Sequence, residues 1–177
     1  MSKRRDRPVI RVNALRQSDC QGHIGLGKLT FRCALGRSGI RALKREGDGA
    51  SPKGRHGLLT VLYRPDRVAR PRTALPVRAI RRTDGWCDAS TDRNYNRPVR
   101  MPYPASAEEL WRSDDLYDIV VVVDHNVRCR GRGRGSAIFM HVADRNYGPT
   151  AGCVALRRLH LQRLLALAPR GARLAIR

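Results

Sequence analysis

The sequence lacks several features that define common classes of protein. No apolar run is longer than that from Ile119 to Val123, whereas a membrane-crossing helix needs roughly 20 such residues. The few cysteines form no CxxC pair, which argues against a zinc ribbon and a dense disulfide framework; they are Cys20, Cys33, Cys87, Cys129 and Cys153. The sequence also contains no HExxH motif, no G-x-S-x-G motif and no paired Cys/His spacing. These absences argue against a membrane span and leave a metal-dependent activity without visible ligands.

An export signal is not visible either. The first residues are basic, but no continuous apolar segment follows them, as a secretory signal peptide would require. Two alternatives remain open at this point. The protein acts in the cytosol, or its export signal is not part of this sequence.

Acidic residues are scarce relative to basic ones. The chain has 36 Lys and Arg against 15 Asp and Glu, a net charge of +21 that is concentrated in the first and last thirds of the sequence. A strongly basic domain is typical of nucleic-acid-binding proteins, yet only 5% of the residues are aromatic, so few side chains could stack on bases. The charge is compatible with polyanion binding and equally with a solvated basic surface.

Length and residue patterns predict one mainly β domain with a C-terminal helix (α+β). The 177 residues, 41% of them hydrophobic, suffice for a single core. Short apolar or alternating runs between turn signals predict strands at Lys28 to Leu35, Gly57 to Tyr63, Pro76 to Ile80, Tyr117 to Val123, Ser136 to Val142 and Arg173 to Ile176. A capping-box pattern at Ser106 predicts a short helix through Trp111. Leucines at helical spacing predict a longer helix from Ala155 to Ala168.

Two glycine-rich segments have other functional interpretations. Gly22 to Lys28 has the spacing of a phosphate-binding loop, but Leu29 stands where a hydroxyl must meet magnesium, and the following residues favour a strand. We therefore do not expect a nucleotide site. Arg128 to Gly135, RCRGRGRG, resembles an arginine-glycine RNA-binding tail, although its place between two strands favours a basic connection.

One constellation near the C-terminal end has the pattern of a catalytic site. His141 ends a predicted strand, and about ten residues later Thr150-Ala151-Gly152-Cys153 precedes the predicted helix. A thiolate at a helix N-terminus is stabilised by backbone N–H groups, and an imidazole can take its proton. Gly152 would let the backbone approach a bound carbonyl, and the amides around Cys153 could form an oxyanion hole. The alternatives are a buried cysteine and a core histidine without a catalytic role.

At these residues the sequence resembles the L,D-transpeptidases with a YkuD-type catalytic domain. That family has a histidine at a strand end followed by a Ser/Thr-x-Gly-Cys segment, here His141 and Thr150 to Cys153. A second segment, LKREGDGASPKGRHGLLTVLY at residues 43–63, is similar to the family's P-G-D-x-x-T-P-x-G stretch. Three positions depart from the family pattern and indicate a divergent subgroup: Val142 replaces Gly, Ala151 replaces His and Ala155 replaces Arg.

The resemblance implies a domain organisation, a fold and a reaction. Residues 28–177 would form a YkuD-like mixed β-sandwich, preceded by a basic N-terminal segment, residues 1–27, that we expect to be extended. Cys153 would attack the carbonyl at the L-centre of diaminopimelate in a peptidoglycan stem peptide, expel the following D-residue and form a thioester. An amine of a second stem would resolve this acyl-enzyme and make a crosslink.

The resemblance also implies roles for further residues. His141 would be the base, and Thr150, with Gly152, would position the reacting groups. His125, Arg134, Arg145 and Arg157 are candidates for substrate binding. No cofactor and no metal are implied, and lactams of the carbapenem type would be inhibitors.

Location and reaction outcome stay open at the level of sequence. Crosslinking takes place in the periplasm or cell envelope, whereas a cytoplasmic enzyme would trim recycled peptides. The same residues would also serve an L,D-carboxypeptidase or endopeptidase that uses water as the acceptor. A third alternative is a non-catalytic scaffold that binds polyanions through its basic surface.

Overall fold

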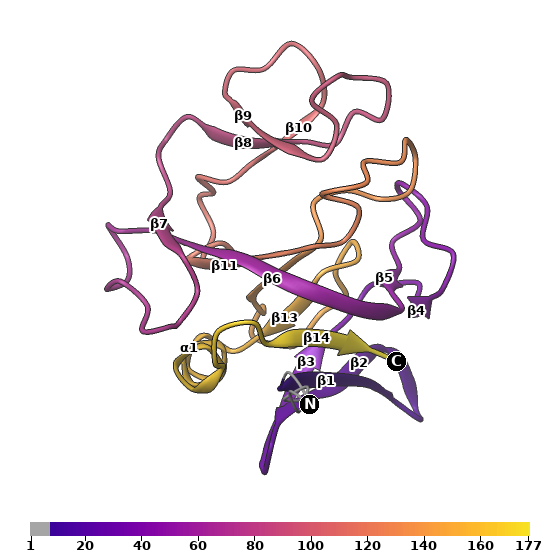
Figure 1. Cartoon of the computed structure of the whole chain (residues 1–177), viewed down its shortest axis with the longest axis vertical. Helices are drawn as coiled ribbons and strands as arrows, with labels where there is room; N and C mark the ends of the chain where they lie inside the picture. Colours follow the sequence, from indigo (N-terminus) through magenta and orange to yellow (C-terminus); the bar gives the residue numbers. More distant parts are fainter. Residues whose placement is uncertain (1–7) are drawn as a thin grey trace, which may run out of the picture.

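The computed structural model describes residues 8–177, which fold as one mainly β domain with a C-terminal helix (Figure 1). The fold class predicted from the sequence is therefore confirmed. The strands are β1 (Val9–Leu15), β2 (Ser18–Leu26), β3 (Leu29–Ala34), β4 (Ile40–Arg41), β5 (Ser51–Pro52), β6 (Gly54–Tyr63), β7 (Val77–Ala79), β8 (Asp84–Cys87), β9 (Arg97–Arg100), β10 (Ala107–Glu109), β11 (Ile119–Val123), β12 (Phe139–Val142), β13 (Val154–Leu156) and β14 (Arg173–Ile176), and the helix is α1 (Arg158–Leu167).

The main sheet closes on itself. Its nine strands have the order β11-β12-β13-β3-β2-β1-β14-β6-β7, and β11 also pairs with β6. The long strand β6 makes this closure possible, because Gly54 to Gly57 pair with β14 and Leu58 to Tyr63 pair with β11. The two halves of the sheet therefore face each other across a shared core, as in a sandwich.

Strand β11 is buried on both faces, which explains its continuous β-branched sequence. Val121 belongs to the main core, which also contains Leu161 and Leu164 of α1. Val120 and Val122 point the other way, into a second cluster with Trp86, which comes from the three-stranded sheet β10-β8-β9. The small sheet thus covers one outer face of the main sheet next to β11 and β12.

The predicted helix from Ser106 to Trp111 is wrong, because its central residues form strand β10. Glu108 pairs with Trp86 in an antiparallel ladder, and Leu110 is fully buried. Pairing with β8 satisfies the backbone groups that a helical turn would otherwise have bonded internally, so tertiary contacts override the local capping signal.

The long helix begins later than predicted. Val154 to Leu156 form strand β13, parallel to β12, and the helix starts at Arg158. Val154 and Leu156 are fully buried in the main core, which favours their strand conformation. The expectation that Cys153 stands at a helix N-terminus is therefore wrong.

The six predicted strands are confirmed, and their ends differ from the predicted ones by three residues at most. The other strands were not predicted as strands: β1, β2, β4, β5, β8, β9, β10 and β13. Strands β1 and β2 include most of the basic N-terminal segment, residues 1–27, whose residues 1–7 lie outside the described residues. The glycine-rich Gly22 to Lys28 lies in β2 and the turn after it, in agreement with our rejection of a phosphate loop. Helix α1 has 10 residues, and no helix within residues 8–177 is long and apolar enough to cross a membrane.

Candidate active site

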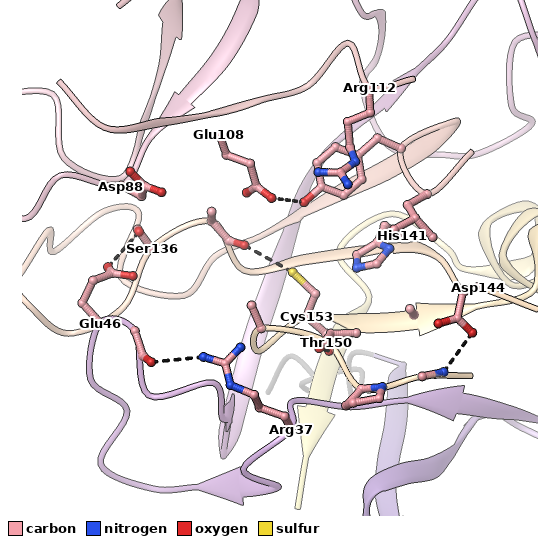
Figure 2. Close-up of a pocket in the computed structure, with 18 of the residues that line it drawn as sticks. Arg37, Glu46, Asp88, Glu108, Arg112, Ser136, His141, Asp144, Thr150 and Cys153 are labelled. Atoms are coloured by element: carbon pink, nitrogen blue, oxygen red, sulfur yellow. Dashed lines mark hydrogen bonds between the residues drawn. The ribbon is translucent and has the colours of Figure 1, made fainter. Parts of the chain in front are cut away.

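Parallel strands bring Cys153 and His141 to the same face of the main sheet. His141 in β12 pairs with Ala155 in β13, and Cys153 directly precedes β13. Because side chains alternate along a strand, Met140 and Val154 enter the main core, while His141 and Cys153 point to the opposite side. There both side chains line one cavity of about 500 Å³ (Figure 2).

The turn that carries Cys153 is fixed by two hydroxyl groups. Thr150 Oγ1 accepts a hydrogen bond from the Gly152 amide, 3.1 Å, and donates one to the Cys153 carbonyl, 2.7 Å. Ser51 Oγ donates to the same carbonyl at 3.4 Å. Gly152 has a φ of +137°, and a Cβ there would lie 2.7 Å from the carbonyl oxygen of Ala50. Glycine is thus required by the close approach of the residue 43–63 segment, and its amide is already engaged by Thr150.

The Cys153 sulfur lies between two backbone groups at the start of β12 and just before it. It accepts a hydrogen bond from the Phe139 amide and donates one to the Ala137 carbonyl, both at 3.3 Å. The residue is only 7% exposed. Burial raises the pKa of the thiol to about 12, and the negative charge of Glu108 acts in the same direction. The sulfur is therefore a protonated thiol at neutral pH.

His141 is held as a neutral imidazole. Its Nδ1 lies 2.8 Å from the Val142 carbonyl, and since a carbonyl oxygen only accepts, Nδ1 carries the proton and Nε2 is left as the base. The ring packs edge-on against Tyr117 at a centroid distance of 5.3 Å. Burial lowers the pKa of His141 to about 4. The resting pair is a thiol and a neutral imidazole rather than the thiolate and imidazolium that a helix N-terminus would favour.

Charged side chains of both signs surround this pair. Arg37, Lys44 and Arg112 line the cavity together with Glu46, Asp88 and Glu108. Several of them already have partners.

Lys44 forms a buried ion pair of 2.5 Å with Asp48 in the residue 43–63 segment. Glu46 accepts hydrogen bonds from Ser136 Oγ, 2.8 Å, and from the Tyr95 hydroxyl. This segment therefore supplies one wall of the cavity.

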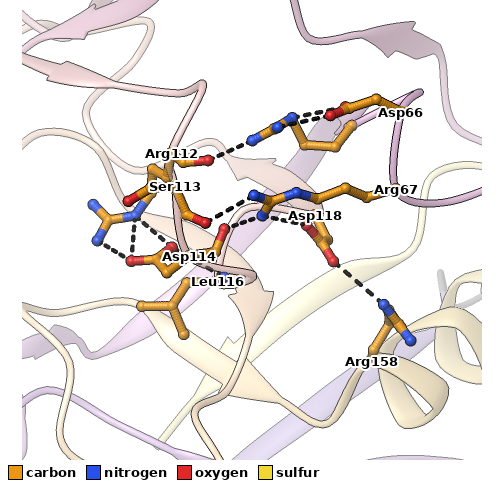
Figure 3. A network of polar contacts seen from close by, with 9 residues as sticks. Asp66, Arg67, Arg112, Ser113, Asp114, Leu116, Asp118 and Arg158 are labelled. Carbon is orange, nitrogen blue, oxygen red and sulfur yellow. Dashed lines mark hydrogen bonds and ion pairs between the residues drawn. The ribbon is translucent and has the colours of Figure 1, made fainter.

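The opposite wall is fixed to the rest of the domain by a network of arginines (Figure 3). Arg67 donates to the Ser113 carbonyl at 2.7 Å and to the Asp114 carbonyl. Asp118, 2% exposed, accepts from Arg67 and from Arg158 of α1, both at 3.3 Å. The segment that presents Arg112 and Tyr117 to the cavity is thereby held against α1 and the turn that follows β6.

The structure brings together only some of the residues singled out from the sequence. Thr150 lines the cavity with the Cys/His pair, but His125 and the three predicted arginines, Arg134, Arg145 and Arg157, are not among its lining residues. The His125 ring instead contacts the Arg134 carbonyl through Nε2 at 3.0 Å.

The arginines at the cavity are Arg37 and Arg112, which sequence reasoning missed. Arg37 could have been found from its position shortly before the residue 43–63 segment, whereas nothing in the sequence around Arg112 indicated a site. Within residues 8–177 no group of three or more His, Cys, Asp or Glu side chains is arranged to hold a metal ion.

Comparison with known proteins agrees with this geometry. The family model of the YkuD L,D-transpeptidase catalytic domain matches residues 19–176, nearly the whole chain. The match begins within β2 and ends in β14, so it includes both walls of the cavity. Searches of the curated proteins and of the solved structures gave no match.

Proposed function

Because the chain belongs to the family of L,D-transpeptidase catalytic domains, we propose that Cys153 is the nucleophile of an acyl transfer on peptidoglycan stem peptides. The observation that carries the proposal is the placement of the Cys153 thiol and the His141 imidazole on neighbouring strands, with both side chains lining one cavity. A nucleophile and a base that face the same enclosed space are the minimum requirement for thioester chemistry.

In the first half of the reaction, the Cys153 sulfur attacks the carbonyl at the L-centre of the third stem residue. His141 Nε2 takes the thiol proton as the S–C bond forms, and the oxygen of the tetrahedral intermediate is stabilised by the Cys153 backbone amide. When the C–N bond breaks, His141 returns that proton to the departing amine of the D-residue. The product is a thioester with a neutral histidine.

In the second half, an amine of another stem attacks the thioester carbonyl. His141 removes a proton from the attacking nitrogen, the C–S bond breaks, and the proton returns to the sulfur. The peptide bond that forms is the crosslink, and the resting thiol is restored. Crosslinking takes place where peptidoglycan is assembled, so we place the reaction at the cell envelope.

The neutral resting pair gives His141 an essential part in this proposal. With the thiol pKa raised to about 12 and the imidazole pKa lowered to about 4, proton transfer must accompany attack. Replacing His141 by Gln should therefore slow thioester formation about 100- to 10,000-fold, the usual cost of losing a general base.

The test is incubation of the protein with purified muropeptides and identification of the products by mass spectrometry. We expect crosslinked dimers from the wild type and none from Cys153→Ala. Cys20 lies outside the cavity, so Cys20→Ala should process muropeptides like the wild type. A carbapenem should add its mass to the peptide that contains Cys153. Turnover by Cys153→Ala would contradict the proposal, and release of the terminal D-residue without dimers would identify a carboxypeptidase.

A further inference from the structure

Two carboxylates face the end of the cavity that the small sheet forms, and the proposed mechanism does not use them (Figure 2). Asp88 directly follows β8, and Glu108 lies in β10 opposite Trp86. Both line the cavity with Cys153, and the charge of Glu108 acts on the Cys153 thiol. They are therefore close to the place where an acyl group would be transferred.

Within residues 8–177 neither carboxylate forms an ion pair, although basic residues outnumber acidic ones by 36 to 15 in the sequence. Two of the cations that line the cavity already have acidic partners. Lys44 pairs with Asp48, and Arg112 pairs with Asp114. Among the described residues, no Lys, Arg or His nitrogen forms an ion pair with Asp88 or Glu108.

Their hydrogen bonding is also incomplete. Asp88 Oδ1 is buried and has no hydrogen-bond partner within the described part of the chain. Glu108 accepts one hydrogen bond, from the Tyr117 hydroxyl. A buried acceptor without a donor costs free energy that a ligand N–H group can recover. Both carboxylates thus have spare accepting capacity, and both residues line the same cavity.

The electrostatics of Glu108 indicate the sign of the missing partner. Burial raises its pKa, and the negative charge of Asp88 raises it further, against the opposing effects of the Tyr117 hydrogen bond and the Arg112 charge. Two like charges in a desolvated site favour a cation between them.

We propose that Asp88 and Glu108 form a subsite for a primary ammonium group of the substrate. A primary ammonium has three N–H donors on one small centre, enough to serve both carboxylates at once. The inference rests on the proposed function, since stem peptides with a diamino acid carry such groups. The ammonium comes either from the donor stem, as the second amine of the residue that is acylated, or from the acceptor stem, as the nucleophile before it loses its proton.

The first experiment measures binding without turnover. The protein carries Cys153→Ser, and the probe is a stem tetrapeptide with a free side-chain amine, compared by calorimetry with the same peptide acetylated on that amine. In this background Glu108→Gln, which keeps an oxygen for the Tyr117 hydroxyl, and Asp88→Asn should each weaken binding of the free-amine peptide about tenfold or more. Binding of the acetylated peptide should hardly change.

Glu109→Gln is the matched control, because Glu109 is the next residue of the same strand and is exposed. It removes the same charge without touching the cavity and should leave both affinities unchanged. The subsite does not exist if the difference in affinity between the free-amine and the acetylated peptide is the same in Glu108→Gln and Asp88→Asn as in the parent Cys153→Ser protein. A loss of affinity equal for both peptides would likewise overturn it.

The second experiment uses protein that keeps Cys153 and shows whether the ammonium group belongs to the donor stem or to the acceptor stem. Slower thioester formation from the free-amine donor in Glu108→Gln identifies the donor stem. An unchanged first step, with a larger share of thioester hydrolysed by water in the presence of an amine acceptor, identifies the acceptor stem. If no stem peptide is turned over while the calorimetric difference persists, the proposed function fails and the ammonium subsite stands.

Discussion

His141 makes the stability of this domain depend on pH in a way that can be calculated. Its pKa falls from the ordinary 6.5 to about 4 because the ring is buried. Above pH 6.5 the ring is neutral in both the folded and the unfolded chain. Between pH 6.5 and 4 the unfolded chain binds a proton that the folded chain does not, so the free energy of unfolding decreases as the pH falls.

The size of this effect follows from the difference of 2.5 pKa units between 6.5 and about 4. At 1.36 kcal/mol per unit, the loss between pH 7.5 and pH 4 is about 3 kcal/mol. Replacing His141 by Gln removes the titration, while the other ionisable groups stay common to both proteins and cancel in the comparison.

The assay is urea unfolding of the wild type and His141→Gln at pH 7.5 and at pH 4. The wild type should lose about 3 kcal/mol more than the variant over this interval. Parallel pH profiles for the two proteins would refute the argument that burial keeps His141 neutral. They would also remove the basis for a neutral resting pair.

Three further predictions concern the turn at Cys153. Gly152→Ala should lower the free energy of unfolding by about 2 kcal/mol or more in urea unfolding, because its Cβ would lie 2.7 Å from the Ala50 carbonyl; an unchanged midpoint would contradict the geometry. Thr150→Val should cost about 1–3 kcal/mol in the same assay, since it removes both hydroxyl hydrogen bonds, whereas Thr150→Ser should retain most of the stability. Iodoacetamide at pH 8 should alkylate the exposed Cys129 well before the buried Cys153, as followed by peptide mass spectrometry, and equal rates would argue against a raised thiol pKa.

The placement of His141 and Cys153 beside each other could be predicted from the sequence because its signals are local. His141 and the Thr150 to Cys153 segment are each short motifs, and parallel pairing of the strands that carry them brings both side chains to one face. The continuous run at Ile119 to Val123 likewise predicted a buried strand, since residues buried on both faces need no polar alternation.

The remainder of the site depends on contacts between distant segments. Glu108 belonged to a segment with a good local helix signal, and only its pairing with β8 turns it toward the cavity. Arg112 reaches the cavity because Arg64 and Arg67, about fifty residues earlier, hold the carbonyls of its segment. The expected thiolate form of Cys153 also depended on a distant feature of the fold. The helix that was expected to stabilise the thiolate begins only at Arg158.

The position of β14 has a consequence for the order in which the domain can form during synthesis. Among the strands of residues 8–177 this one comes last in sequence, yet it lies between β1 and β6 in the sheet. Until the ribosome has released residues 173–176, β1 and the first half of β6 each have an open edge, and the ring around the core is incomplete. In the nascent chain, Cys153 is therefore synthesised before the ring of strands around the core can close, and during this interval the open edges of β1 and β6 are free to pair with other strands.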